Sequence, residues 1–176
     1  GSHMNKVFFA ASGSEANDTA MKMVWYYNAA LGQPEKRKII SRKKGYHGVT
    51  IAAASMTALA YAQDGFGLPL DFVKHTTAPD YYNEAQIDES EEDFANRCAL
   101  ELEELILAEG PDTVAELFAE PVMGAGGVII PPAGYFEKIR SVLEKYDVLL
   151  VADEVICGFG RTGNMWGSQT LSLIHI

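Results

Sequence analysis

At residues 148–155 the sequence reads Val-Leu-Leu-Val-Ala-Asp-Glu-Val, and this stretch decides the fold. Five apolar residues in succession, closed by Asp153, predict a β-strand that is buried on both faces of a parallel sheet. Ligands of open α/β sheets bind beyond the carboxyl ends of the strands. Asp153 is therefore either a cap on the following turn or a charge directed at a ligand.

The rest of the chain alternates between further strands and helices. Short apolar runs predict strands at residues 6–10, 37–41 and 115–119, with one more near 72–73. Apolar residues at helical spacing predict helices over 16–31, 52–55, 90–109 and 135–146. Strands that alternate with helices favour an α/β fold in which a mostly parallel sheet is flanked by helices.

The composition argues against several classes of partner. The net charge of -10 over 176 residues leaves no basic stripe for nucleic acid. The basic clusters at 36–38 and 42–44 are predicted to be a solvated strand edge. Cys98 and Cys157 lack the spacing of a metal site or a disulfide scaffold, and no membrane-spanning run or signal peptide is visible. We therefore expect no metal, no nucleic acid and no membrane partner, and a cytoplasmic location.

Both ends of the chain differ from the rest. Residues 1–4 (Gly-Ser-His-Met) match the scar that tag cleavage leaves. The apolar tail at 171–176 has no cap or turn residues, so it is expected to be non-native or truncated sequence. Residues 5–170 are then expected to form part of one domain of a larger protein.

Two turns in the sequence could bind a ligand. Gly13 and Ser14 lie in a Gly/Ser break before a helix, an arrangement that directs free backbone N–H groups at an anion. The alternative is an ordinary helix that Ser14 caps. Glycines flank Tyr46 and His47, which are either plain turn residues or exposed rings offered to a flat ligand.

The parallel sheet would bring these turns together with two acids at the strand ends, Glu120 and Asp153. Pyridoxal phosphate could use all of them, because it carries a phosphate, a flat ring and a basic ring nitrogen. Tyr46 would stack on one ring face and Val155 would close the other. The carboxylate of Asp153 would favour the protonated ring nitrogen, because an opposite charge stabilises the charged form.

At these residues the chain resembles a known enzyme family. Five motifs occur in the order found in class III pyridoxal-phosphate-dependent aminotransferases. They are Ser-Gly-Ser-Glu-Ala-Asn-Asp at 12–18, Gly-Tyr-His-Gly at 45–48, Glu-Pro-Val at 120–122, Asp-Glu-Val at 153–155 and Gly-Phe-Gly-Arg-Thr-Gly at 158–163. The resemblance implies that residues 5–170 are part of the large domain of a fold-type I transferase that binds pyridoxal phosphate.

The resemblance also implies a role for individual residues. The family's cofactor-binding positions correspond here to Gly13, Ser14, Tyr46, His47, Glu120, Asp153 and Val155. Gly13 and Ser14 match residues that bind the phosphate, and Tyr46 matches the residue that stacks on the ring. Asp153 matches the partner of the ring nitrogen, and Val155 matches the residue on the opposite ring face. His47 is expected to support Asp153, and Glu120 is expected to lie close to the cofactor.

The chain departs from the family in ways that bear on activity. The family carries the cofactor as a Schiff base on a lysine beyond the aspartate, but no lysine follows Lys145 in this sequence. The family's N-terminal segment and its small C-terminal domain are also missing. We therefore expect this chain by itself to be catalytically incompetent.

The resemblance extends to a branch of the family. Ala125 stands where relatives that act on ornithine-like diamino acids place a glutamate, and residues 121–128 resemble the omega-amine:pyruvate branch. This implies a transaminase that moves an amino group from an amine or omega-amino acid to a keto acid such as pyruvate. It also implies a homodimer or higher oligomer whose active sites are shared between subunits. The alternatives are another class III enzyme (an aminomutase, decarboxylase or racemase), a hydrolase built from Ser14, His47 and Asp153, and a non-catalytic fragment.

Overall fold

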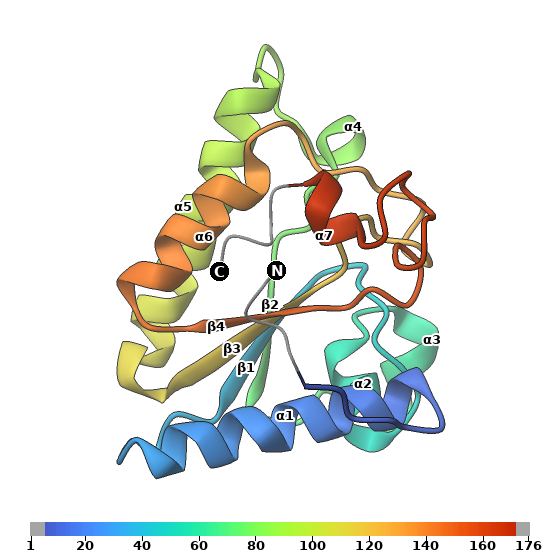
Figure 1. The fold of residues 1–176 in the computed structure, drawn as a ribbon. Coiled ribbons are helices and arrows are strands. Elements are labelled where there is room, and N and C mark those ends of the chain that lie inside the picture. Colours follow the sequence, from blue (N-terminus) through green and yellow to red (C-terminus); the bar gives the residue numbers. More distant parts are fainter. Residues whose placement is uncertain (1–5, 172–176) are drawn as a thin grey trace.

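A four-stranded parallel sheet forms the centre of the molecule, and helices cover both of its faces (Figure 1). The computed structural model describes residues 6–171. The strands lie in the order β2-β1-β3-β4, and every neighbouring pair is parallel. This confirms the α/β class that the alternation of strands and helices predicts. The expectations for residues 1–4 and for 172–176 lie outside the described residues.

Apart from the strand predicted at 6–10, the predicted strands and helices are present in the predicted order; the short helices at 60–63, 81–84, 111–113 and 167–170 were not predicted. The strands are β1 (Lys38–Arg42), β2 (Val73–Thr76), β3 (Val114–Ala119) and β4 (Leu149–Ala152). The helices are α1 (Gly13–Ala30), α2 (Ile51–Met56), α3 (Ala60–Gln63), α4 (Tyr81–Glu84), α5 (Glu91–Glu109), the short 3-10 helix η1 (Pro111–Thr113), α6 (Tyr135–Lys145) and α7 (Gly167–Thr170). Within the described range, no helix is both long and apolar enough to cross a membrane.

Helices α5 and α6 pack side by side over one face of the sheet (Figure 1). The side chain of Ser90 caps α5 by accepting the Asp93 N–H at 3.1 Å, and the helix ends at Gly110, whose φ is 90°. The apolar stripe of α5 packs into this core, and its Phe94 and Leu102 are fully buried. This layer holds the largest of the three buried hydrophobic clusters in the described residues, and its helices were predicted from their apolar spacing.

Helices α1 and α2 cover the opposite face of the sheet. Met21 of α1 packs there against Ile39 and Phe118 from the two central strands. Ala53 of α2 is fully buried in the same cluster. The N-terminal end of α1 thereby comes to the edge of the sheet where the strands end.

Two strand predictions differ from the structure. Residues 6–10 form no strand, and Val7, Phe8 and Phe9 are exposed, because an apolar run becomes a strand only where a neighbour supplies its hydrogen bonds. Strand β4 forms as predicted but is not buried on both faces. It lies at the edge of the described sheet, so Leu149 to Val151 are only partly buried.

The basic clusters are not a uniformly solvated strand edge either. The side chain of Lys36 is buried, and its Nζ donates to the carbonyl oxygens of Tyr146 (3.1 Å) and Asp147 just after α6. Arg42 is also buried, and its guanidinium donates to the carbonyl oxygen of Glu120 and lies over the ring of Phe136. Backbone carbonyls at the ends of elements accept hydrogen bonds from both cations, and Arg42 Nε and Nη1 have no further partner among the described residues.

Candidate functional site

The predicted site residues meet in one pocket at the carboxyl ends of the strands. The pocket has a volume of about 280 Å³. It is lined by all seven predicted residues and by Asn17, Gly48, Ala125 and Ile156; the predicted set is Gly13, Ser14, Tyr46, His47, Glu120, Asp153 and Val155. Four segments that are far apart in the sequence therefore converge there: the start of α1, the turn after β1, the end of β3 and the end of β4.

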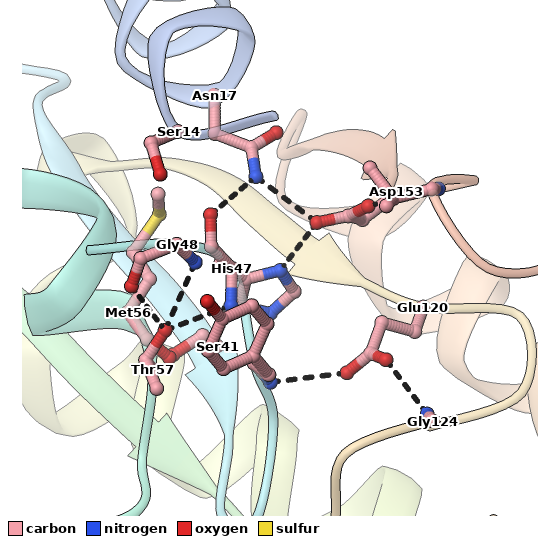
Figure 2. Close-up of polar contacts among 12 residues, drawn as sticks. Ser14, Asn17, Ser41, His47, Gly48, Met56, Thr57, Glu120, Gly124 and Asp153 are labelled. Atoms are coloured by element: carbon pink, nitrogen blue, oxygen red, sulfur yellow. Dashed lines mark hydrogen bonds and ion pairs between the residues drawn. The ribbon is translucent and has the colours of Figure 1, made fainter. Parts of the chain in front are cut away.

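Asp153 follows β4 directly and is held by four hydrogen bonds. Its backbone N–H donates to the carbonyl oxygen of Ala119 at 2.9 Å, which continues the β3–β4 pairing by one residue. Its Oδ2 accepts from Asn17 Nδ2 (3.0 Å) and from His47 Nδ1 (2.9 Å), as Figure 2 shows. Its Oδ1 accepts the N–H of Val155 at 3.2 Å. The side chain of Asp153 thus caps the next turn and also lines the pocket, so the two roles considered for it from the sequence are compatible.

The charge of Asp153 follows from the same contacts. Burial disfavours the ionised carboxyl, but the hydrogen bond and charge of His47, together with the donors from Asn17 and Val155, outweigh it and lower the pKa of Asp153. Asp153 is therefore ionised at neutral pH and can only accept hydrogen bonds.

His47 is among the residues that line the pocket, but its side chain has no exposure to solvent. Its ring is buried and stands edge-on to Phe118, with 5.9 Å between the ring centroids. The expectation that glycines leave this ring exposed is wrong, because the turn folds it back beneath the strand ends. Since Asp153 is ionised, the shared proton sits on His47 Nδ1. The opposite nitrogen, Nε2, has no hydrogen-bond partner among residues 6–171.

Glu120 joins the two loops that border the pocket. Its Oε1 accepts the N–H of Tyr46 at 3.1 Å, and its Oε2 accepts the N–H of Gly124 at 2.8 Å (Figure 2). Arg42 donates to the carbonyl oxygen of Glu120. Tyr46 itself is half-buried. Glu120 therefore fixes the backbone that carries Tyr46 and the start of the loop that carries Ala125.

The N-terminus of α1 forms one wall of the pocket. The helix is capped by Ser12, whose Oγ accepts the N–H of Glu15 at 3.2 Å, so the expectation that Ser14 is the cap is wrong. Ser14 Oγ instead accepts the N–H of Val49 at 3.0 Å, which leaves its own proton free to donate. The first N–H groups of a helix have no acceptor within it and carry a partial positive charge. Gly13 and Ser14 therefore present donors to any anion in this pocket.

The glycines here allow close packing. A Cβ on Gly48, whose φ is 131°, would overlap the Ser14 side chain, with 2.9 Å to its Cα. A Cβ on Gly13 would lie 3.2 Å from a methyl group of Val155. Val155 is 71% exposed and lines the pocket from the side of β4.

Two residues that hold the site together were not predicted as site residues. Asn17 lies one helical turn after Gly13, so its position inside the motif was the only signal for it. Thr57 follows α2, and its Oγ1 accepts the N–H groups of His47 (2.8 Å) and Gly48 (3.1 Å). No pattern in the sequence points to Thr57, because its partners come from a turn nine or ten residues earlier.

The hydrolase alternative fails on this geometry. A serine nucleophile needs a base within hydrogen-bonding distance of its Oγ. Within the described chain, His47 Nδ1 is bound to Asp153 and His47 Nε2 is unpartnered, while Ser14 Oγ is bound to the N–H of Val49. Ser14 and His47 therefore do not form a nucleophile–base pair.

Comparisons with known proteins identify the family of the chain. Residues 1–174 match the family described as "Aminotransferase class-III". The chain is 56% identical over 170 residues to "Gamma aminobutyrate transaminase 3, chloroplastic" of Solanum lycopersicum, covering 97% of this chain and 33% of that protein. It is 55% identical over 171 residues to a diaminobutyrate–2-oxoglutarate transaminase of Halomonas elongata, covering 96% of this chain and 36% of that protein. A crystal structure of the omega transaminase from Pseudomonas jessenii in complex with PMP has a TM-score of 0.95 and 61% identity, covering 97% of this chain and 38% of that one.

These matches establish the family and the extent of the likeness. The chain spans about a third of the length of the curated relatives it matches. The fold is that of the corresponding part of a solved transaminase. The family match extends over almost the whole sequence. The chain therefore belongs to the class III aminotransferase family, whose members depend on pyridoxal phosphate.

Proposed function

We propose that the protein from which this chain derives is an omega-amine:pyruvate-type transaminase with pyridoxal phosphate in the pocket described above. It would move an amino group from an amine or omega-amino acid to a keto acid such as pyruvate. The observation that carries the proposal is the convergence of Ser14, Tyr46 and Asp153 on one pocket. This cofactor needs three groups: a hydrogen-bond donor to its phosphate, an aromatic side chain against its ring, and an ionised acid beside its ring nitrogen.

The residues of the pocket fit the cofactor chemically. The free N–H groups at the start of α1 and the available proton of Ser14 suit a phosphate. Gly48 leaves room beside Ser14 that any larger residue would fill. Asp153 is ionised by its surroundings before any ligand binds, so it can stabilise a protonated ring nitrogen. When bound, the cofactor would supply an acceptor for the electrons of a carbanion.

Each residue then has a definite task. Gly13 and Ser14 bind the phosphate and so anchor one end of the cofactor. Tyr46, fixed through its backbone by Glu120, provides a surface for one ring face. Asp153 holds the proton on the ring nitrogen. Val155 lies across the pocket on a different segment, where it can cover the other ring face.

The substrate class is proposed from relatives and from one residue. The matching proteins from tomato and Halomonas are named for gamma-aminobutyrate and diaminobutyrate, both of which carry a terminal primary amine. Ala125 lines the pocket and adds no charge there. This favours an amine donor without a second charged group at that point. A class III aminomutase, decarboxylase or racemase remains the alternative, and a substrate profile of the longer protein would distinguish them.

Cofactor binding can be tested on the chain itself by titration with pyridoxal phosphate. We expect Asp153→Asn to weaken the affinity about 10-fold or more, because a charge-assisted hydrogen bond is lost. Asp71→Asn, a change in an exposed acid outside the pocket, should leave the affinity unchanged. Equal affinities for the Asp153→Asn variant and the unaltered chain would refute the proposed site.

We propose further that this chain alone does not turn over. None of the residues that line the pocket within the described range is a lysine, and no lysine follows Lys145 in the sequence. After borohydride treatment with equimolar pyridoxal phosphate, peptide mapping should therefore show no single lysine that is modified stoichiometrically. One fully modified lysine would contradict the proposal.

The assembly and the location are also proposals. Val155, Ile156 and Phe159 beside the pocket are more than half exposed, which suits an active site that a second subunit covers. Light scattering of the longer protein should then show a dimer or a higher oligomer, and a monomer would contradict this. A cytoplasmic location is proposed from the cysteine usage alone. The matching tomato protein is named as chloroplastic, so the comparison does not support that location.

A further inference from the structure

Asn17 makes two hydrogen bonds across the site from one amide nitrogen. It lies in α1, one turn after Gly13, and is almost fully buried. Its Nδ2 donates to the carbonyl oxygen of His47 at 2.7 Å and to Asp153 Oδ2 at 3.0 Å (Figure 2). Both partners are acceptors only, so the nitrogen of the amide, and not its oxygen, must face them.

The two bonds connect three separate parts of the fold. Asn17 belongs to the helix whose first turn forms the anion wall, His47 to the turn after β1, and Asp153 to the end of β4. Ser14 and Asn17 are three residues apart in α1 and so lie on the same side of the helix. Any shift of the helix start would therefore move the Ser14 hydroxyl and the donor to Asp153 together.

A second asparagine of the same helix shows what a purely architectural role looks like. Asn28 is also buried, and its Nδ2 donates to the carbonyl oxygen of Lys36 at 3.3 Å, at the opposite end of α1. That bond ties the helix end to the following loop. Asn17, by contrast, donates to Asp153, the ionised side chain that the proposed function pairs with the ring nitrogen.

We infer that Asn17 is a positioning residue of the proposed transaminase site, which holds the Asp153 carboxylate in one orientation and ties it to the phosphate end of α1. This inference rests on the proposed function of the pocket. The amide suits the task because it donates hydrogen bonds without adding a positive charge. A lysine or arginine at position 17 would pair with Asp153 and compete with a protonated ring nitrogen for its charge. Asn17 leaves that charge available.

The first experiment titrates Asp153 by carboxyl-detected NMR in the chain without cofactor. We expect Asn17→Ala to raise the pKa of Asp153 by about one unit, because a donor to the ionised form is lost. Asn17→Asp should raise it further, because a second carboxyl then adjoins the first. Asn28→Ala is the matched control and should leave the pKa of Asp153 unchanged. An unchanged pKa in both Asn17 variants would overturn the inference.

A measurement on the unaltered chain covers the case in which the variants do not fold. The side-chain amide protons of Asn17 should shift with pH, with an inflection at the pKa of Asp153. Amide protons without that inflection would equally overturn the inference.

The second experiment concerns the ring nitrogen. Titrations compare pyridoxal phosphate with a phosphate-bearing analogue whose ring has carbon in place of that nitrogen. We expect the preference for pyridoxal phosphate to fall about 10-fold in Asn17→Ala and to stay the same in Asn28→Ala. An unchanged preference in Asn17→Ala would show that Asn17 does not position Asp153 for the ring. If the unaltered chain binds neither compound, the proposed function fails for this chain, and the NMR titration still decides whether Asn17 controls Asp153.

Discussion

Glu116 is an acid in the middle of the central strand β3, and replacing it tests the energetics of the fold. Its Cα is paired with Ile39 on one side and Leu149 on the other, and its side chain is fully buried. Neither carboxyl oxygen has a hydrogen-bond partner within the described residues. Burial without a partner raises the pKa of Glu116 to about 8. At neutral pH this side chain is therefore protonated in the folded chain.

The cost of this arrangement follows from the difference between the two states. In the unfolded chain Glu116 has its ordinary pKa of 4.5, so above that pH the unfolded state binds fewer protons than the folded state. The free energy of unfolding therefore falls as pH rises from about 4.5 to about 8, and no further loss occurs above that range. At about 1.4 kcal/mol per pH unit, the loss at pH 7 amounts to about 3 kcal/mol.

The substitution Glu116→Gln removes the titration while keeping the size of the side chain. We expect the variant and the unaltered chain to differ little in stability near pH 5. As pH rises, the free energy of unfolding of the variant should increase relative to that of the unaltered chain, by about 4 kcal/mol between pH 5 and pH 8. Urea unfolding followed by circular dichroism at several pH values measures this difference.

A second glutamate provides the control. Glu103 is bound by Lys145 and Tyr146, and the hydrogen bond from Lys145 is the largest cause of its lowered pKa. Its contribution is already complete above its ordinary pKa, so the difference between Glu103→Gln and the unaltered chain should be constant from pH 5 to pH 8. A constant difference for Glu116→Gln as well, or a variant that is less stable at pH 8, would refute the reasoning about the buried acid.

Two further predictions concern the turn that carries Tyr46, which is proposed to stack on the cofactor ring. Gly48→Ala should destabilise the chain by about 2 kcal/mol, because φ is 131° and the new Cβ would overlap Ser14; unaltered stability in urea unfolding would contradict this. Thr57→Val should cost about 2 kcal/mol, because the N–H groups of His47 and Gly48 lose their buried acceptor. Thr57→Ser keeps the hydroxyl and should cost clearly less, so equal losses in the two Thr57 variants would contradict that account.

Sequence patterns predicted those elements that depend on local periodicity. α5 and α6 each bury one apolar stripe, and β3 is a continuous apolar run apart from Glu116, so their positions follow from spacing alone. The run at 6–10 is equally apolar but forms no strand, since pairing depends on residues elsewhere in the chain. The edge position of β4 could not be predicted for the same reason, because strand order is a property of the whole sheet.

The pocket was predictable to a different degree. Gly13, Tyr46 and Asp153 stand at breaks after apolar runs or in glycine turns, where the sequence itself marks a strand end or a turn. Asn17 and Thr57 sit in or just after helices and carry no such mark. Their roles arise from contacts across the fold, so only the folded chain reveals them.

The hydrogen bonds around the pocket explain why its shape does not require a ligand. In and around its lining, Asn17, Thr57 and Glu120 each use their polar atoms to join two segments of backbone or to hold a neighbouring side chain. The groups that remain available to a ligand are the first N–H groups of α1, the proton of Ser14 and the charge of Asp153. A ligand that binds there need not order these loops first, so little of its binding energy is lost to rearrangement. The site is also sensitive to the residues that support it. Removing the donor of Asn17 affects Asp153, and removing the acceptor of Thr57 affects the turn that carries Tyr46, although neither change alters Asp153 or Tyr46 itself. For that reason the substitutions at Asn17 and Thr57 test the site more sharply than changes to Ser14, Tyr46 or Asp153 themselves.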